Sequence, residues 1–234
     1  MKEISDSLKH LNQLATQEYL AVNAQENPII QVLPNVSFPQ LVAIMQQYCI
    51  LTKEFIVSLL QLALSKALEA RKLGVVQDLQ ANLAEELGKD TTQGVPHYLL
   101  LADAMEEALS ISFVDPEPLP ATSKLLKDLK TIFNQESSYA LGAAYAMELT
   151  SAPDMRIAVR VLNSLFKNAI PHKLQYFFDL HLGEWEPEHE ANLRTILTKD
   201  LNVNELPEFE AGFRVYLAAM NRWWKELQTE VKFL

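Results

Sequence analysis

Residues 41–64 read LVAIMQQYCILTKEFIVSLLQLAL, a strongly apolar run without glycine or proline. It is too long for one strand and is rich in residues that favour helices. Ser37, just before it, is a suitable N-cap. The run predicts a central helix that leads from Ser37 past Cys49 towards Leu60, with helical structure continuing over residues 51–73.

The rest of the chain has the composition of an all-α protein. Only 6 of the 234 residues are glycine, and long segments are rich in Ala, Leu, Glu, Lys and Gln. Few segments alternate polar and apolar residues with the period of a strand. Further helices are expected near residues 5–23, 75–87, 97–111, 123–134, 136–149, 153–168, 204–234, and from 171 into the region of 181. We expect one domain covering residues 1–234.

The charge and the apolar segments exclude several classes of protein. A net charge of -10 argues against binding to nucleic acid or to anionic lipid, because both need clustered Lys and Arg. The amphipathic start of the chain has no apolar signal region, and no uninterrupted apolar stretch reaches the roughly 20 residues that span a bilayer. Cys49 is the single cysteine, which excludes a disulfide within the chain. We expect a cytoplasmic protein.

Residues 176–193, YFFDLHLGEWEPEHEANL, concentrate side chains that bind metals. On a helix, the pairs His181/Glu184 and Glu186/His189 each project from one face, because their members are three residues apart. Each pair could bind one ion. The alternative is that these residues form only a solvated acidic helix end.

Carboxylates on apolar helical stripes extend this set. Glu148 shares a stripe with Leu141, Ala144 and Tyr145, and a carboxylate in such surroundings needs a cation nearby. Glu86 occupies a similar position, with Glu85 as the solvent-facing alternative, and His97 opens the next helix after Pro96. Three carboxylates and three imidazoles are the ligand inventory of a carboxylate-bridged di-iron or di-manganese centre in a helical bundle. The six residues are Glu86, His97, Glu148, His181, Glu186 and His189.

Three segments recur in this order in a known family. They are NLAEELG (82–88), GAAYAMELTSAP (142–153) and YFFDLHLGEWEPEHE (176–190), with His97 between the first two. Together they resemble the haem-oxygenase-like di-metal oxidases, nearest the chlamydial death-domain-associating (CADD-like) proteins and more distantly the thiaminase-II and PqqC proteins. The resemblance covers roughly residues 26–193 and implies a haem-oxygenase-like helical bundle whose metals are bound by the six residues named above.

Two departures from the family pattern stand out. His181 and His189 are eight residues apart instead of seven, and the aspartate between them is replaced by Glu186 or Glu184. The chlamydial relatives also make p-aminobenzoate from a tyrosine of their own chain with the help of a lysine. The corresponding stretch here, TSAPDMRIAVR (150–160), contains no lysine, so we do not transfer that activity.

The sequence thus predicts a non-haem di-metal oxidase that activates O₂ and oxidises a small organic substrate. Its cofactor would be two iron ions per chain, or iron and manganese, with Glu86 and Glu148 as catalytic ligands and Tyr145 as a donor beside them. The apolar C-terminal helix, which contains Trp223 and Trp224, suggests a homodimer.

Two other functions remain open at the level of sequence. The first is a metal-free binding or interaction module of the same fold, in which these residues form a buried salt-bridged network. The second is cofactor-independent catalysis as in thiaminase-II relatives, which would require Cys49 as the nucleophile.

Overall fold

The computed structural model describes residues 2–89 and 94–234, except for the side chains of residues 184–187. Over these residues the chain is all-α, a bundle of helices without a strand, as the composition predicts. The α-helices are α1 (Lys2–Glu18), α2 (Pro28–Val32), α3 (Phe38–Glu54), α4 (Leu60–Glu69), α5 (Leu73–Ala84), α6 (His97–Leu109), α7 (Pro120–Phe133), α8 (Ser137–Leu165), α9 (His172–Leu180), α10 (Glu186–Asp200) and α11 (Leu206–Val231). Short 3₁₀ turns are η1 (Leu33–Asn35) and η5 (Val203–Glu205), and π turns are η2 (Phe55–Leu59), η3 (Glu85–Lys89) and η4 (His181–Trp185).

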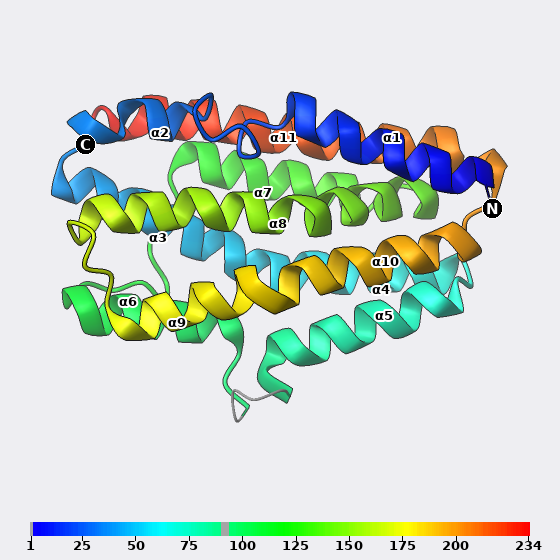
Figure 1. Cartoon of the computed structure of the whole chain (residues 1–234), viewed down its shortest axis with the longest axis horizontal. Coiled ribbons are helices and arrows are strands. Elements are labelled where there is room, and N and C mark those ends of the chain that lie inside the picture. Colours follow the sequence, from blue (N-terminus) through cyan, green and yellow to red (C-terminus); the bar gives the residue numbers. More distant parts are fainter. Residues whose placement is uncertain (1, 90–93) are drawn as a thin grey trace.

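Most helices run along the long axis of the molecule, with α8 near the middle (Figure 1). Helix α8 packs against α11 on one side and against α3, α4 and α10 on others. In Figure 1, α1, α2 and α11 lie along one edge of the bundle, and α5, α6 and α9 lie along the opposite edge. Residues of α8 therefore have a buried environment on several faces.

Two glycines allow α8 and α11 to approach each other closely. A Cβ atom at Gly142 would lie 1.9 Å from the carbonyl oxygen of Phe209, and one at Gly212 would lie 1.9 Å from that of Tyr139. Both distances are shorter than any tolerable contact, so any larger residue at either position would force the helices apart. This contact sets the depth at which α8 lies in the bundle.

The structure corrects the prediction that one helix ends near residue 149 and another starts at Pro153. A single helix α8 runs through Pro153, which is buried. Proline removes one backbone hydrogen bond and is costly inside a helix. Here buried apolar residues on both sides of Pro153 hold the helix together, because tertiary packing contributes more to helix stability than local propensity does.

The central apolar run forms α3, η2 and α4, a continuous helical stretch from Phe38 to Glu69. Gln40 accepts a hydrogen bond from the backbone N–H of Ser37 at 2.8 Å, consistent with Ser37 at the start of α3. Within the described residues this is the one helix long and apolar enough to cross a membrane. Its parts α3 and α4 both pack against α8 inside the bundle.

The C-terminal helix belongs to the same buried core. The indoles of Trp223 and Trp224 are each 1% exposed, and their ring centroids lie 4.4 Å apart. Phe233, beyond the end of α11, is 85% exposed. The two tryptophans are thus used within the bundle, and the homodimer remains an expectation.

Candidate metal centre

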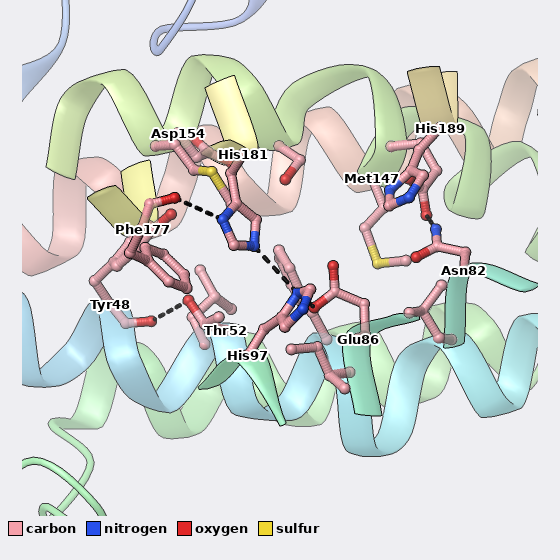
Figure 2. Close-up of a pocket in the computed structure, with 17 residues that line it drawn as sticks. Tyr48, Thr52, Asn82, Glu86, His97, Met147, Asp154, Phe177, His181 and His189 are labelled. Carbon is pink, nitrogen blue, oxygen red and sulfur yellow. Dashed lines mark hydrogen bonds and ion pairs between the residues drawn. The ribbon is translucent and has the colours of Figure 1, made fainter. Parts of the chain in front are cut away.

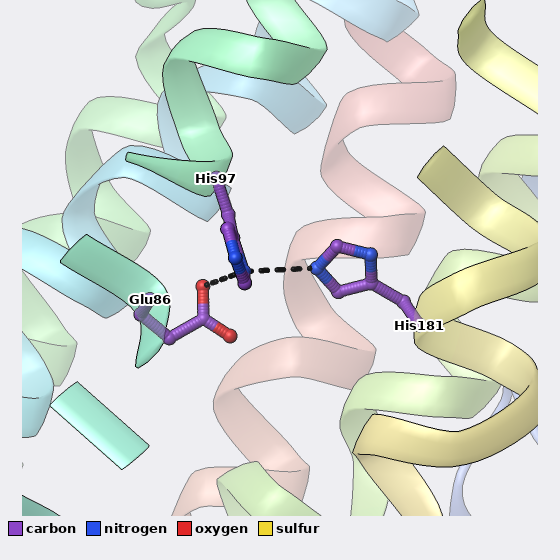
Figure 3. Close-up of side chains that lie close together, drawn as sticks. All are labelled: Glu86, His97 and His181. Atoms are coloured by element: carbon purple, nitrogen blue, oxygen red, sulfur yellow. Dashed lines mark hydrogen bonds and ion pairs between the residues drawn. The ribbon is translucent and has the colours of Figure 1, made fainter. Parts of the chain in front are cut away.

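Three predicted ligands converge inside the bundle. Glu86, His97 and His181 are each at most 8% exposed, and one ligand atom from each lies within 4.8 Å of the others. His97 Nδ1 is 3.1 Å from Glu86 Oε2 and 3.2 Å from His181 Nε2 (Figure 3). One nitrogen thus faces a carboxylate and a second imidazole at once.

Local backbone features aim these side chains at each other. Glu86 lies in the π turn η3, inside which Gly88 adopts φ 87° and interrupts the helical backbone. Only glycine adopts this conformation without strain. A Cβ atom at Gly88 would also lie 2.6 Å from the carbonyl oxygen of Val95. Pro96 is the N-cap of α6, and His97 is the first residue of this helix.

The surroundings of His181 prepare its Nε2 atom to bind a cation. The backbone carbonyl of Phe177 lies 2.8 Å from His181 Nδ1, so Nδ1 donates its hydrogen to that carbonyl and Nε2 keeps its lone pair. Burial disfavours the charged imidazolium and lowers the pKa of His181 from 6.5 to about 4. At neutral pH the ring is therefore a neutral ligand directed at His97.

The donor set fits a divalent cation. The single Nδ1 position of His97 faces two acceptors, the carboxylate of Glu86 and the lone pair of His181. A cation among the three atoms would satisfy all of them, and it would offset the cost of burying the carboxylate. Carboxylate oxygen combined with imidazole nitrogen is a donor set that divalent transition metals bind.

The cluster borders a small cavity of about 60 Å³ (Figure 2). Glu148 and His189, two further predicted ligands, line the same cavity. Glu148 Oε1 accepts a hydrogen bond from Asn82 Nδ2 at 3.0 Å, and both residues are 7% exposed. His189 Nε2 lies 3.0 Å from Glu85 Oε2. Five of the six predicted ligands therefore lie around one cavity.

The π turns explain how the sequence reaches this arrangement. Each of η2, η3 and η4 contributes to the cavity lining, through Phe55, Glu86 and His181 respectively. A π turn holds one residue more than an α-helical turn and is frequent at functional sites. The turn η4 lies between His181 and His189, so it absorbs the extra residue of the eight-residue spacing and brings His189 back to the cavity side.

Comparisons with known proteins place the chain in a family. A family model described as a domain of unknown function with a solved structure, DUF3865, matches residues 5–230. The chain belongs to this family. No match was found among curated proteins.

The DUF3865 chain is similar along its whole length to a CADD-like protein of unknown function from Nostoc punctiforme PCC 73102. In one crystal structure of that protein, the sequence is 45% identical to this chain and the TM-score is 0.94. The match covers 99% of each of the two chains. A second crystal structure of the same protein is 43% identical in sequence, with a TM-score of 0.91. That match covers 99% of this chain and 97% of the Nostoc chain. These likenesses agree with the CADD-like resemblance in the sequence.

The remaining predicted residues of this DUF3865 member are Glu184, Glu186 and Tyr145. The side chains of Glu184 and Glu186 are outside the described residues. The hydroxyl of Tyr145 is 2.6 Å from Asn12 Oδ1 and 3.0 Å from Glu190 Oε1, on the side of α8 that faces α1 and α10. Burial, together with Glu190, raises the pKa of Tyr145, which stays protonated. Tyr145 does not line the cavity described above.

Sequence reasoning missed a buried carboxylate of the cavity wall. Asp154 is 2% exposed and lines the cavity. The hydroxyl of Tyr19 donates to Asp154 Oδ1 at 2.6 Å, and Trp224 Nε1 lies 3.3 Å from the same oxygen. A helix predicted to start at Pro153 makes Asp154 an ordinary first-turn acid. A continuous α8 would have marked it as a second buried carboxylate close to Glu148.

The thiol of Cys49 has the properties of a core residue. It is 5% exposed, and burial raises its pKa to about 12. The thiolate, which is the nucleophilic form, is therefore scarce at neutral pH. Cys49 also does not line the cavity, although its neighbour Tyr48 does. These features argue against a cysteine nucleophile in this site.

Proposed function

We propose that the chain is a haem-oxygenase-like oxidase with a dinuclear non-haem iron, or iron and manganese, centre that uses O₂ to oxidise a small organic substrate. The observation that carries this proposal is the convergence of three buried ligand atoms, from Glu86, His97 and His181, within 4.8 Å of one another. The resemblance of the three ordered sequence segments to di-metal oxidases supports it.

The residues divide into two groups around the cavity. Glu86, His97 and His181 would hold the first metal, and their burial shields it from bulk solvent. Glu148 and His189 line the same cavity and would hold the second metal, together with Glu186. Reduced iron or manganese would supply the electrons for the reduction of O₂.

The protein's own contribution is orientation, charge and a small, largely apolar cavity. The Phe177 carbonyl fixes the tautomer of His181, and the Asn82 amide orients the carboxylate of Glu148. The carboxylates neutralise the charge of bound cations. Apolar side chains of Leu51, Ile56 and Met147 complete the wall and keep water away from the reacting groups.

A metal-free module is the second candidate, and two contacts favour it. Glu148 has a protein partner in Asn82, and His189 has one in Glu85. The buried pair of Glu148 with Asn82 satisfies both groups without a metal, and the pair of His189 with Glu85 gives this imidazole a partner at the surface. In that case, the same residues would serve the stability of a binding protein.

Anaerobic loading with ferrous iron distinguishes the two functions. The oxidase should take up about two ions per chain and consume O₂ afterwards. Glu148→Ala should lower the iron content, whereas Glu188→Ala, an exposed carboxylate of α10, should not. No iron uptake by wild-type protein, or equal behaviour of the two variants, would favour the metal-free module.

A further inference from the structure

The cavity at the metal cluster is too small for an organic substrate. Its volume is about 60 Å³, whereas one water needs at least about 10–15 Å³ by the same kind of measure. It can therefore hold a few water-sized ligands. Pockets for organic ligands usually measure roughly 300–1,000 Å³. A substrate therefore needs another space that touches the ligands.

A groove between α6 and α9 has the required size and place. Its volume is about 510 Å³. Phe177 and His181 line both the groove and the cavity, so these two side chains are the shared wall. Their ring centroids lie 4.1 Å apart, and both side chains are labelled in Figure 2. A molecule in the groove would lie directly behind a metal ligand.

Much of the groove lining is apolar. Leu100 and Ala104 of α6 face Tyr176 and Leu180 of α9 across it. Tyr176 is 59% exposed, a large fraction for an aromatic side chain. This lining suits a hydrocarbon or aromatic body, which would gain stability by covering these side chains.

The charged groups at the rim leave one negative charge. Glu107 and Lys173 form an ion pair across the groove, between α6 and α9, and cancel each other. Asp103 also lines the groove, is exposed, and forms no ion pair with any residue that the structure describes. Its carboxylate is complementary to an ammonium group.

We infer that the α6–α9 groove binds the organic substrate as an amphipathic amine, with its apolar body on Leu100 and Tyr176 and its ammonium group at Asp103. The oxidation of this substrate depends on the proposed function. Binding in the groove does not, because none of the groove contacts is made by a metal.

Binding of n-octylamine to metal-free, full-length protein tests the inference by equilibrium dialysis at pH 7, with octanoate as the matched anion. We expect about one octylamine per chain, and octanoate binding weaker by about fivefold or more, in line with one exposed charge pair. Asp103→Asn should weaken octylamine binding by about fivefold and remove its preference over octanoate. Tyr176→Ala should weaken both ligands by about fivefold through the lost apolar contact.

The control variant is Asp179→Asn, which removes an exposed carboxylate of α9 that does not line the groove. It should bind octylamine as the wild type does. Absence of octylamine binding, equal binding of octanoate, or equal effects of Asp103→Asn and Asp179→Asn would overturn the inference. Asp103 and Tyr176 are exposed, so neither substitution should unfold the chain.

Ferrous uptake by the same proteins separates this inference from the proposed function. If the wild type binds octylamine as expected but no iron, the groove stands and the oxidase function fails. If it binds iron but no octylamine, the groove assignment fails alone. Asp103→Asn and Tyr176→Ala should both keep wild-type iron uptake, because neither residue lines the metal cavity.

Discussion

Two neighbouring glutamates of the same turn have opposite environments. Glu86 lies 3.1 Å from His97 beside a second imidazole, and its side chain is 10% exposed. Glu85 lies 3.0 Å from His189, and its side chain is 48% exposed. The distances are almost equal, but exposed pairs contribute only up to about 1 kcal/mol, while buried charges must be compensated in full. Burial, rather than distance, distinguishes a candidate metal ligand from a surface pair.

Stabilisation by metal should separate the two glutamates most strongly. At a free ferrous concentration about 1,000 times the dissociation constant, a bound ion adds about 4 kcal/mol to the free energy of unfolding. Anaerobic urea unfolding should show this gain in wild type and in Glu85→Gln. Glu86→Gln should lose most of it, because the ion loses its carboxylate. An equal gain in both variants would place the metal elsewhere.

Acid should weaken the buried cluster through His181. Its pKa is about 4 in the folded protein against 6.5 ordinarily, so the unfolded chain binds a proton that the folded chain does not. The contribution of neutral His181 to the free energy of unfolding is fully present above pH 6.5. It falls as the pH drops and is lost by about pH 4. Its size is on the order of 3 kcal/mol.

Urea unfolding of metal-free protein between pH 7 and pH 4 measures this effect. His181→Gln is the reference, since carboxylates elsewhere titrate equally in both proteins. The difference in free energy of unfolding between the wild type and His181→Gln should shrink as the pH falls. A difference that is constant with pH would mean that burial does not perturb this imidazole.

Apolar substitutions in metal-free protein should reveal the free-energy cost of burying the Glu86 carboxylate. In metal-free protein, Glu86→Met should raise the free energy of unfolding by about 1 kcal/mol, because a buried carboxylate is removed while His97 keeps neutral His181 as a partner. Glu85→Met should change it by less than about 0.5 kcal/mol. Chemical denaturation without metal makes the comparison. A loss of stability in Glu86→Met would show that the carboxylate serves structure.

The sequence predicted much of this arrangement because its signals are local. Backbone rules predict that one helix ends at Gly88 and that the next begins at His97. These two boundaries bring Glu86 close to His97. The choice between Glu85 and Glu86 stayed open because adjacent residues of a helical turn differ by about 100° in direction. Only packing decides which of them faces the core.

The features that escaped prediction depend on tertiary contacts. The continuity of α8 through Pro153 depends on burial against its neighbouring helices. The partnership of Asn82 with Glu148 joins residues 66 positions apart. The contact of Tyr19 with Asp154 joins residues 135 positions apart. No local pattern encodes such pairs.

Anomalous diffraction at the iron edge, from crystals grown anaerobically with ferrous iron, tests the central claim most directly. We predict a peak within bonding distance of Glu86, His97 and His181, and no peak bound by Glu85 alone. Iron found only at exposed carboxylates, or no peak at the buried cluster under saturating iron, would contradict the assignment of this cluster as a metal centre.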